Sequence, residues 1–119
     1  MPKRVLVVED ERDVAELVST VLSMEGFEAY ISSGPQALAD ALSFQPDVVL
    51  LDLMMPEVDG FEVARRLRAH QVTEGLPIVV MTAMHDAALR AKQIGTELFL
   101  PKPFDINELV RIVEEAALA

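Results

Sequence analysis

Two apolar runs of this chain each end in acidic residues, which is an unusual place for charge. Residues 48–51 (VVLL) lead directly into Asp52, and residues 5–8 (VLVV) lead into the acidic stretch 9–11 (EDE). Burying a carboxylate without a partner is expensive, so acids at these positions need either a counter-charge or a chemical role. Clustered carboxylates repel one another unless a cation lies among them, and Mg²⁺ prefers carboxylate oxygens, carbonyls and water.

A hydroxyl and an ammonium group follow two further apolar runs. Thr82 comes after residues 78–81 (IVVM), and Lys102 comes after residues 98–100 (LFL), between two prolines. The ammonium can follow a phosphoryl oxygen or pair with Asp52, and the hydroxyl can donate to a phosphoryl oxygen. A carboxylate facing Mg²⁺, with both groups beside it, is equipped to attack phosphorus and form an acyl phosphate.

The elements that must position these groups alternate between strand and helix five times. The strand runs lack polar alternation, which is typical of burial on both faces and so predicts an α/β fold with a parallel sheet between two helical layers. Predicted strands span residues 5–8, 27–31, 48–51, 78–81 and 98–100, and predicted helices span residues 13–24, 35–44, 61–70, 87–94 and 106–118.

The order of the strands decides whether the candidate residues meet. Ligands of open parallel sheets lie at the carboxyl ends of the strands, where the strand order reverses. With the flavodoxin-like order 2-1-3-4-5, the crevice falls between the first and third strands. Asp10 and Asp52 would then share one pocket, flanked by Thr82 and Lys102.

Composition narrows the class of protein. The 119 residues are 51% hydrophobic, which fits one domain over 1–119 with a real core. The chain has no cysteine, a net charge of −10 and no apolar stretch of membrane-spanning length. These features argue against a nucleic-acid surface and a membrane segment, and they are compatible with a cytoplasmic location. The basic cluster at Arg65, Arg66 and Arg68 is interpreted as a solvent-exposed face of the third predicted helix.

Four stretches, VVEDE, LLDLMMPEVDG, VVMTAM and FLPKPFD, resemble the signature motifs of the receiver domain of two-component response regulators. They occur in the family's order and spacing, and the resemblance covers essentially the whole chain. It implies that Asp52 is the phosphoacceptor. It also implies a metal site for Mg²⁺, with Mn²⁺ possible, made by Asp10, Asp52, the backbone carbonyl of Met54 and, through water, Glu9.

The resemblance further implies a switch rather than an enzyme. A sensor histidine kinase or a histidine phosphotransfer protein would supply the phosphoryl group, Thr82 and Lys102 would contact it, and Phe99 would turn inward. The surface of the fourth helix, fifth strand and fifth helix would then change and control a partner or effector, in a monomer or a phosphorylation-dependent dimer. The family also usually has a cis Lys102–Pro103 peptide.

Three positions modify that expectation. Phe99 replaces the commoner tyrosine of the family and lacks its hydroxyl, so its inward state gains packing only. Met54 and Met84 stand where the family's residues flank the route of the hydrolytic water. Because both side chains are apolar, they can exclude a water and cannot orient one, which predicts a long-lived acyl phosphate.

Two other functions stay open from the sequence. One is a Mg²⁺-dependent phosphatase that forms an aspartyl phosphate, although its DxDx motif after the first strand is missing. The other is a degenerate receiver used only for dimerisation, against which the intact Asp10, Asp52, Thr82 and Lys102 argue. The ending VEEAALA lacks a basic tail of the kind that leads into a DNA-binding domain, which favours a single-domain regulator over a fragment.

Overall fold

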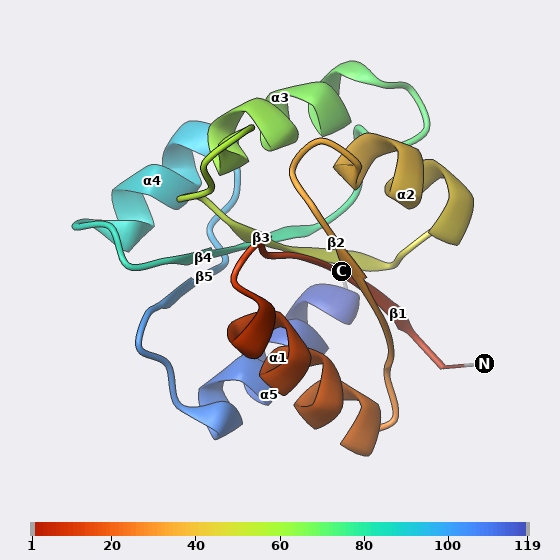
Figure 1. The fold of residues 1–119 in the computed structure, drawn as a ribbon, viewed down its shortest axis with the longest axis vertical. Helices are drawn as coiled ribbons and strands as arrows, with labels where there is room; N and C mark the ends of the chain where they lie inside the picture. Colours follow the sequence, from red (N-terminus) through yellow and green to blue (C-terminus); the bar gives the residue numbers. More distant parts are fainter. Residues whose placement is uncertain (1, 119) are drawn as a thin grey trace.

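The computed structural model describes residues 2–118 and contains one five-stranded sheet (Figure 1). All neighbouring strands are parallel, and their order is β2-β1-β3-β4-β5. The predicted α/β class and strand order are therefore confirmed. The strands are β1 (Arg4–Val8), β2 (Glu28–Ser32), β3 (Val48–Asp52), β4 (Ile78–Thr82) and β5 (Phe99–Pro101).

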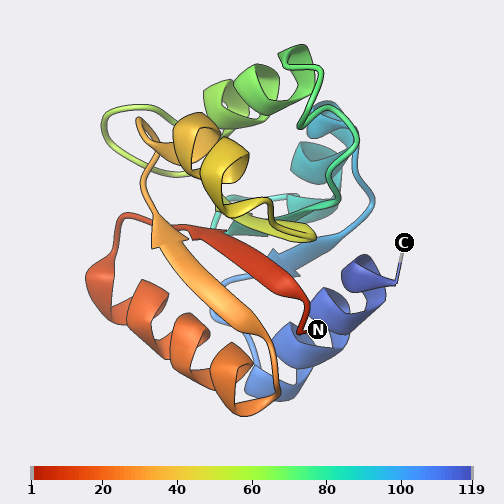
Figure 2. The ribbon, with the colours of Figure 1, turned by 90° about the vertical axis from the view of Figure 1, so that its right-hand side faces the viewer.

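Five helices cover the two faces of the sheet in separate layers. Helices α1 and α5 lie on one face, and α2, α3 and α4 lie on the other (Figures 1 and 2). None of the helices in residues 2–118 is long and apolar enough to cross a lipid bilayer. Their bounds are α1 (Arg12–Met24), α2 (Ala37–Phe44), α3 (Gly60–Ala69), α4 (Ala87–Ile94) and α5 (Ile106–Ala117).

Successive residues of the central strands feed two different cores. Val48 and Leu50 of β3 pack in the cluster with α1 and α5, whereas Val49 and Leu51 pack in the cluster with α2, α3 and α4. Every residue of β3 and of β4 is buried. The unbroken apolar runs are thus explained by burial on both faces, as a parallel sheet requires.

The helix ends follow the expected capping chemistry. The side chain of Asp59 accepts from Glu62 N at 2.9 Å, and the side chain of Asp105 accepts from Asn107 N at 2.7 Å. Gly95 ends α4 with φ 94°, a left-handed conformation that glycine adopts without strain. Asp59 and Asp105 therefore mark where two loops of the carboxyl edge end and their helices begin.

The start of α2 differs from the prediction. The helix begins at Ala37, and Pro35 lies in the preceding turn rather than in the first helical turn. Ala37 N donates to Gly34 O, so residues 34–36 form a separate turn before the helix. A proline is compatible with either position because only its φ angle is fixed, which is why the sequence did not distinguish them.

Candidate functional site

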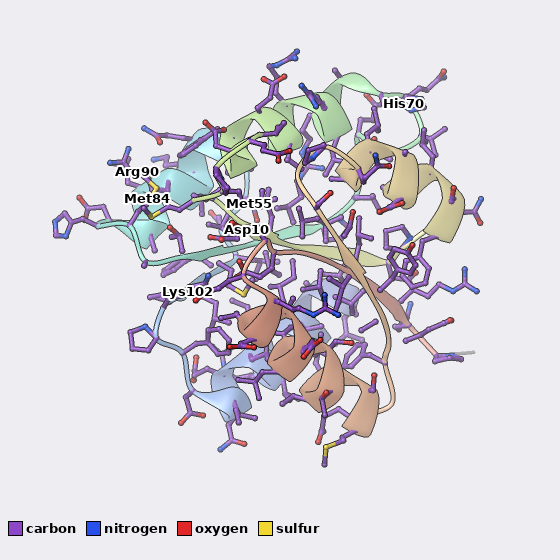
Figure 3. All side chains as sticks on the ribbon, viewed as in Figure 1. Asp10, Met55, His70, Met84, Arg90 and Lys102 are labelled. Atoms are coloured by element: carbon purple, nitrogen blue, oxygen red, sulfur yellow. The ribbon has the colours of Figure 1, made fainter. Side chains whose placement is uncertain are left out.

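Three carboxylates meet at the carboxyl edge of the sheet, between β1 and β3. Glu9, Asp10 and Asp52 each place a carboxylate oxygen within 4.8 Å of the other two. Glu9 and Asp52 are both 3% exposed, whereas Asp10 is exposed on the loop before α1 (Figure 3). The predicted approach of Asp10 and Asp52 is therefore found, and Glu9 completes the group.

Lys102, on the loop after β5, reaches this acidic group from the other side. Its Nζ lies 2.6 Å from Glu9 Oε1 and 3.5 Å from Asp52 Oδ2. The predicted pairing with Asp52 is present, but the closer partner is Glu9. The sequence contained one indication of this contact. Glu9 directly follows a buried strand and so needs a cation, and Lys102 follows another strand that ends at the same edge of the sheet.

The two partners show how strongly burial acts here. Burial raises the pKa of Glu9, because desolvation disfavours its charged form more than the hydrogen bond from Lys102 favours it. Burial alone would lower the pKa of Lys102, but the hydrogen bond to Glu9 and the charge of Asp52 outweigh it, so this pKa is raised. The single ammonium group of Lys102 lies close to both Glu9 and Asp52, and its one positive charge does not balance two carboxylates.

The Asp52 carboxylate is held on one side and opens towards a cavity on the other. Its Oδ1 accepts from Met54 N at 3.2 Å, which orients the carboxylate on the turn after β3. A cavity of about 310 Å³ lies beside it. The residues that line this cavity are Asp10, Glu11, Asp52, Met54, Ala83 and Lys102. A group of phosphoryl size has room there, next to a carboxylate and an ammonium.

Thr82 lies on the neighbouring strand and is fully buried. Its Oγ1 accepts from Met84 N at 3.0 Å, and its carbonyl accepts from Lys102 N at 2.8 Å. The Lys102–Pro103 peptide is cis, as expected from the resemblance. Thr82 is absent from the cavity lining, so the structure joins it to Lys102 through backbone while its hydroxyl faces the next loop.

The three positions expected to tune the switch lie in different environments. Phe99 is partly buried against the core below α2, α3 and α4, in register with Val80. Met84 is partly buried against the same core, on the loop before α4 (Figure 3). Met54 is 58% exposed and lines the cavity. Of the two methionines, only Met54 therefore stands at the cavity itself.

One residue that positions the site was not singled out from the sequence for that role. Gly60, the first residue of α3, has no room for a side chain, because a Cβ atom would collide with the carbonyl oxygen of Asp52 and with Leu53. Gly60 N also donates to Leu53 O at 3.1 Å. The contact holds the start of α3 against the end of β3. The helix predicted over residues 61–70 begins next to Gly60, but the sequence did not indicate this close packing.

The donor set fits a hard divalent cation. Three carboxylates within 4.8 Å offer oxygen ligands of the kind that Mg²⁺ and Mn²⁺ bind. A cation beside Glu9 would also offset the desolvation that raises its pKa. The residues therefore fit the metal that the resemblance implied, with Asp10 the most accessible of the three.

Comparison with relatives of known sequence places this site in context. The DNA-binding response regulator MtrA of Mycolicibacterium paratuberculosis is 42% identical over 113 residues, which are 92% of this chain and 49% of MtrA. The regulatory protein AtoC of Escherichia coli is 37% identical over 116 residues, 95% of this chain and 25% of AtoC. The chain thus spans about half the length of MtrA and a quarter of AtoC.

Solved structures agree over the full length of the chain. A Chloroflexus aurantiacus protein provisionally assigned as a response regulator superposes with a TM-score of 0.92 at 32% identity, covering 100% of both chains. The receiver domain of the Pseudomonas aeruginosa sensor histidine kinase PA1611, which has a magnesium ion in its active-site cleft, gives 0.89 at 27% identity, again over 100% of both. Residues 5–114 match the response regulator receiver domain, and the chain belongs to that family.

Proposed function

We propose that residues 1–119 act as a single receiver domain, in which Asp52 is the phosphoacceptor of a two-component signalling switch. This proposal depends on the groups that surround the Asp52 carboxylate. Its carboxylate borders a cavity of about 310 Å³ that Asp10 and Lys102 also line. The Lys102 ammonium is 3.5 Å away. Membership of the receiver family supports the same role.

In the proposed reaction, a carboxylate oxygen of Asp52 attacks the phosphorus of a phosphohistidine on a sensor kinase or phosphotransfer protein. A bond forms between that oxygen and phosphorus, and the bond between phosphorus and the imidazole nitrogen breaks. The electron pair stays on the imidazole, which takes up a proton from solvent. Lys102 is placed to pair with the transferred group, whose oxygens carry the negative charge.

The metal site that we propose consists of Asp10, Asp52 and the backbone carbonyl of Met54, with Glu9 acting through a water molecule. Bound Mg²⁺, or Mn²⁺, would neutralise negative charge on the transferring oxygens. The approach of the three carboxylates to within 4.8 Å supports this assignment. The magnesium ion reported in the receiver domain of PA1611 supports it by similarity.

We further propose how the new charge is transmitted. The Thr82 hydroxyl exchanges its bond from Met84 N for a bond to a phosphoryl oxygen, and Phe99 turns into the space that Thr82 leaves. Both residues lie on the two strands next to α4, and Phe99 is in register with Val80. The surface formed by α4, β5 and α5 would then favour its second conformation and bind its target.

The partners follow from this scheme. Upstream stands a sensor histidine kinase or a histidine phosphotransfer protein, in the cytoplasm. Downstream stands a protein or an effector domain that recognises the α4–β5–α5 surface, either of a monomer or of a dimer that forms on phosphorylation. The curated relatives are about twice to four times as long as the matched segment, which is consistent with effector domains in those proteins.

Met54 and Met84 would set the lifetime of the phosphorylated state. Met54 lines the cavity and Met84 lies beside Thr82, and neither side chain can orient a water for hydrolysis. We expect Met54→Asn to shorten the lifetime more than Met84→Asn does, because only Met54 borders the cavity. Release of phosphate from purified phosphorylated protein measures this, and loss from the parent chain within seconds would contradict the proposed stability.

The proposal is tested with acetyl phosphate as a small donor. In the presence of Mg²⁺, the protein should gain one phosphoryl group in an intact-mass measurement, and Asp52→Asn should gain none. Asp59→Asn is the matched control, because asparagine caps a helix as well as aspartate does and Asp59 lies outside the cavity. It should be phosphorylated like the parent chain.

The same experiment separates the other two functions. Continuous hydrolysis of phosphomonoesters with multiple turnovers would indicate a phosphatase. No mass change under any Mg²⁺ concentration would indicate a receiver that acts only as a binding surface. Modification that persists in Asp52→Asn would move the phosphoacceptor elsewhere and would contradict the assignment of Asp52.

A further inference from the structure

Helices α3 and α4 differ in charge from the rest of the chain. They carry five of the ten basic residues and one acidic residue, Glu62, in a chain whose net charge is −10. Each of the other three helices carries more acidic than basic residues. The two helices lie side by side on one face of the sheet (Figure 1). The basic residues are Arg65, Arg66, Arg68, Arg90 and Lys92.

A hollow of about 290 Å³ lies between these helices. Ala64 is buried, and Phe61 and Ile94 are partly buried, so the inner part of the hollow is apolar. Its volume is at the lower end of the range of small-molecule sites and is large enough to receive one large apolar side chain. Its lining residues are Phe61, Ala64, Arg65, Arg68, Gln93 and Ile94.

The positive charge around the hollow is only partly compensated. Arg65 and Arg66 both pair with the single carboxylate of Glu62, so two guanidinium groups share one negative charge. Arg68 donates to the carbonyl oxygens of Glu74 and Leu76, at 2.9 Å and 2.6 Å, which are neutral acceptors. The charge of Arg68 therefore stays available to an anion.

Arg90, one helical turn before Gln93 and Ile94 on α4, lies outside the lining of the hollow. Its Nη1 donates to Gln93 Oε1 over a long 3.4 Å, and Gln93 lines the hollow. Its Nε is buried without a hydrogen-bond partner, the one such side-chain atom found in residues 2–118. Figure 3 shows Arg90 near Met84, which lies on the loop before α4. Arg90 therefore adds positive charge beside the hollow without forming part of its lining.

We propose that the hollow between α3 and α4 binds an acidic segment of a partner protein. Arg65 and Arg68 form the arginine rim of the hollow. An apolar side chain of that segment enters the hollow between Phe61 and Ile94, and neighbouring carboxylates pair with Arg65 and Arg68. Such a segment combines the apolar anchor and the flanking charge that this surface complements. The site lies on the α3 side of α4, and binding there does not require phosphorylation of Asp52.

A protein segment fits better than a nucleic acid. The basic area is confined to two helices, and the whole chain has a net charge of −10. A long polyanion gains affinity by contacting many cations, and outside α3 and α4 the chain has five basic and nineteen acidic residues. A short acidic segment contacts the arginine rim alone. The apolar inner part of the hollow also offers no hydrogen-bond donor to a phosphate group.

The probe is a short fluorescent peptide of Asp and Glu residues around a central Phe, with binding followed by fluorescence anisotropy at low salt. Arg65→Glu should weaken binding about tenfold or more, because it places like charges together. Arg111→Glu is the matched control: both arginines pair with a glutamate three residues earlier, and their side chains are 67% and 60% exposed. It should change binding less than about twofold.

Two further measurements complete the test. A peptide in which Ser replaces the central Phe should bind more weakly, and amide shifts on adding the Phe peptide should centre on α3 and α4. Equal losses in Arg65→Glu and Arg111→Glu would overturn the proposal as general charge attraction. Equal competition by duplex DNA, or shifts centred on another face, would also overturn it. Self-association through α3 and α4 in sedimentation would make the occupant a second copy instead.

Discussion

Two glutamates of this protein lie beside basic side chains and respond in opposite ways. Glu62, on α3, accepts hydrogen bonds from Arg65 and Arg66, which lower its pKa to about 2. Glu9, at the carboxyl edge of the sheet, accepts a 2.6 Å hydrogen bond from Lys102, and yet burial raises its pKa. The presence of a cation at short distance is therefore not enough to determine how a carboxylate behaves.

The difference comes from exposure and from the ratio of charges. The Glu62 side chain is 35% exposed and has two guanidinium groups to itself. The Glu9 side chain is 0% exposed and shares one ammonium with Asp52. The α3 cluster has two guanidinium groups for one carboxylate, whereas the pocket at the strand ends has one ammonium group for the three carboxylates of Glu9, Asp10 and Asp52. Glu62 therefore needs no further cation, whereas the carboxylates of the pocket gain from a divalent cation.

The largest expected effect concerns Lys102. Lys102→Met should destabilise the metal-free protein by about 3 kcal/mol, the low end for a broken buried pair because the lysine keeps some exposure. The reason is that Glu9 would stay buried with no cation. The free energy of unfolding, from urea titration in EDTA, measures this effect.

The double variant Glu9→Gln with Lys102→Met tests the cause. It should recover most of the lost stability, because the buried charge is then removed with its partner. On α3, Arg66→Met should shift the urea midpoint far less, since Glu62 keeps Arg65. If Lys102→Met is as stable as the parent chain, the pocket does not depend on this ammonium and the contrast between the two glutamates fails.

The next largest effect concerns metal affinity. Glu9→Gln should weaken Mg²⁺ and Mn²⁺ binding about 10- to 100-fold, the usual effect of losing a partner that orients the metal's ligands. Glu62→Gln, an identical change on a surface helix, should leave the affinity unchanged. Isothermal titration calorimetry gives both constants directly. Equal affinities in the two variants would exclude Glu9 from the metal site.

Much of this arrangement was predictable from the sequence because it rests on the strand ends. In a parallel sheet each strand begins at the same edge, so residues that follow the apolar runs must gather, as Asp10, Asp52 and Lys102 do. The caps at Asp59 and Asp105 were predictable for a similar reason, since their chemistry is local. These features follow from chain direction and from residues a few positions apart.

Other features depend on packing that no local pattern specifies. In α1, Leu17 is 47% exposed while the smaller Ala15 is 1% exposed, so hydrophobicity alone does not tell which of the two residues faces the core. The preference of Lys102 for Glu9 over Asp52 is a difference between 2.6 Å and 3.5 Å. Differences of this size are set by side-chain packing across residues far apart in the chain.

The smallest expected effect concerns stability in acid, and the two glutamates should affect it in opposite directions. The pKa of Glu62 falls from 4.5 in the unfolded chain to about 2 in the fold, so its ion pairs stabilise the protein above pH 4.5 and this contribution is lost as the pH falls towards 2. Glu62→Gln should remove that loss and flatten the pH dependence in this range. The effect should be modest and should shrink in high salt, because these side chains are exposed.

Glu9 gives the opposite slope. Because its pKa in the fold lies above 4.5, its protonated form contributes stability below pH 4.5, and this contribution is lost as the pH rises through the raised pKa. In the parent chain, the Glu9 contribution to the free energy of unfolding falls as the pH rises, and the Glu62 contribution rises. In EDTA, Glu9→Gln should therefore remove the fall, and Glu62→Gln should remove the rise. Urea midpoints at a series of pH values, for both variants and the parent chain, compare the two slopes. Parallel curves for the two variants would show that burial does not separate these carboxylates.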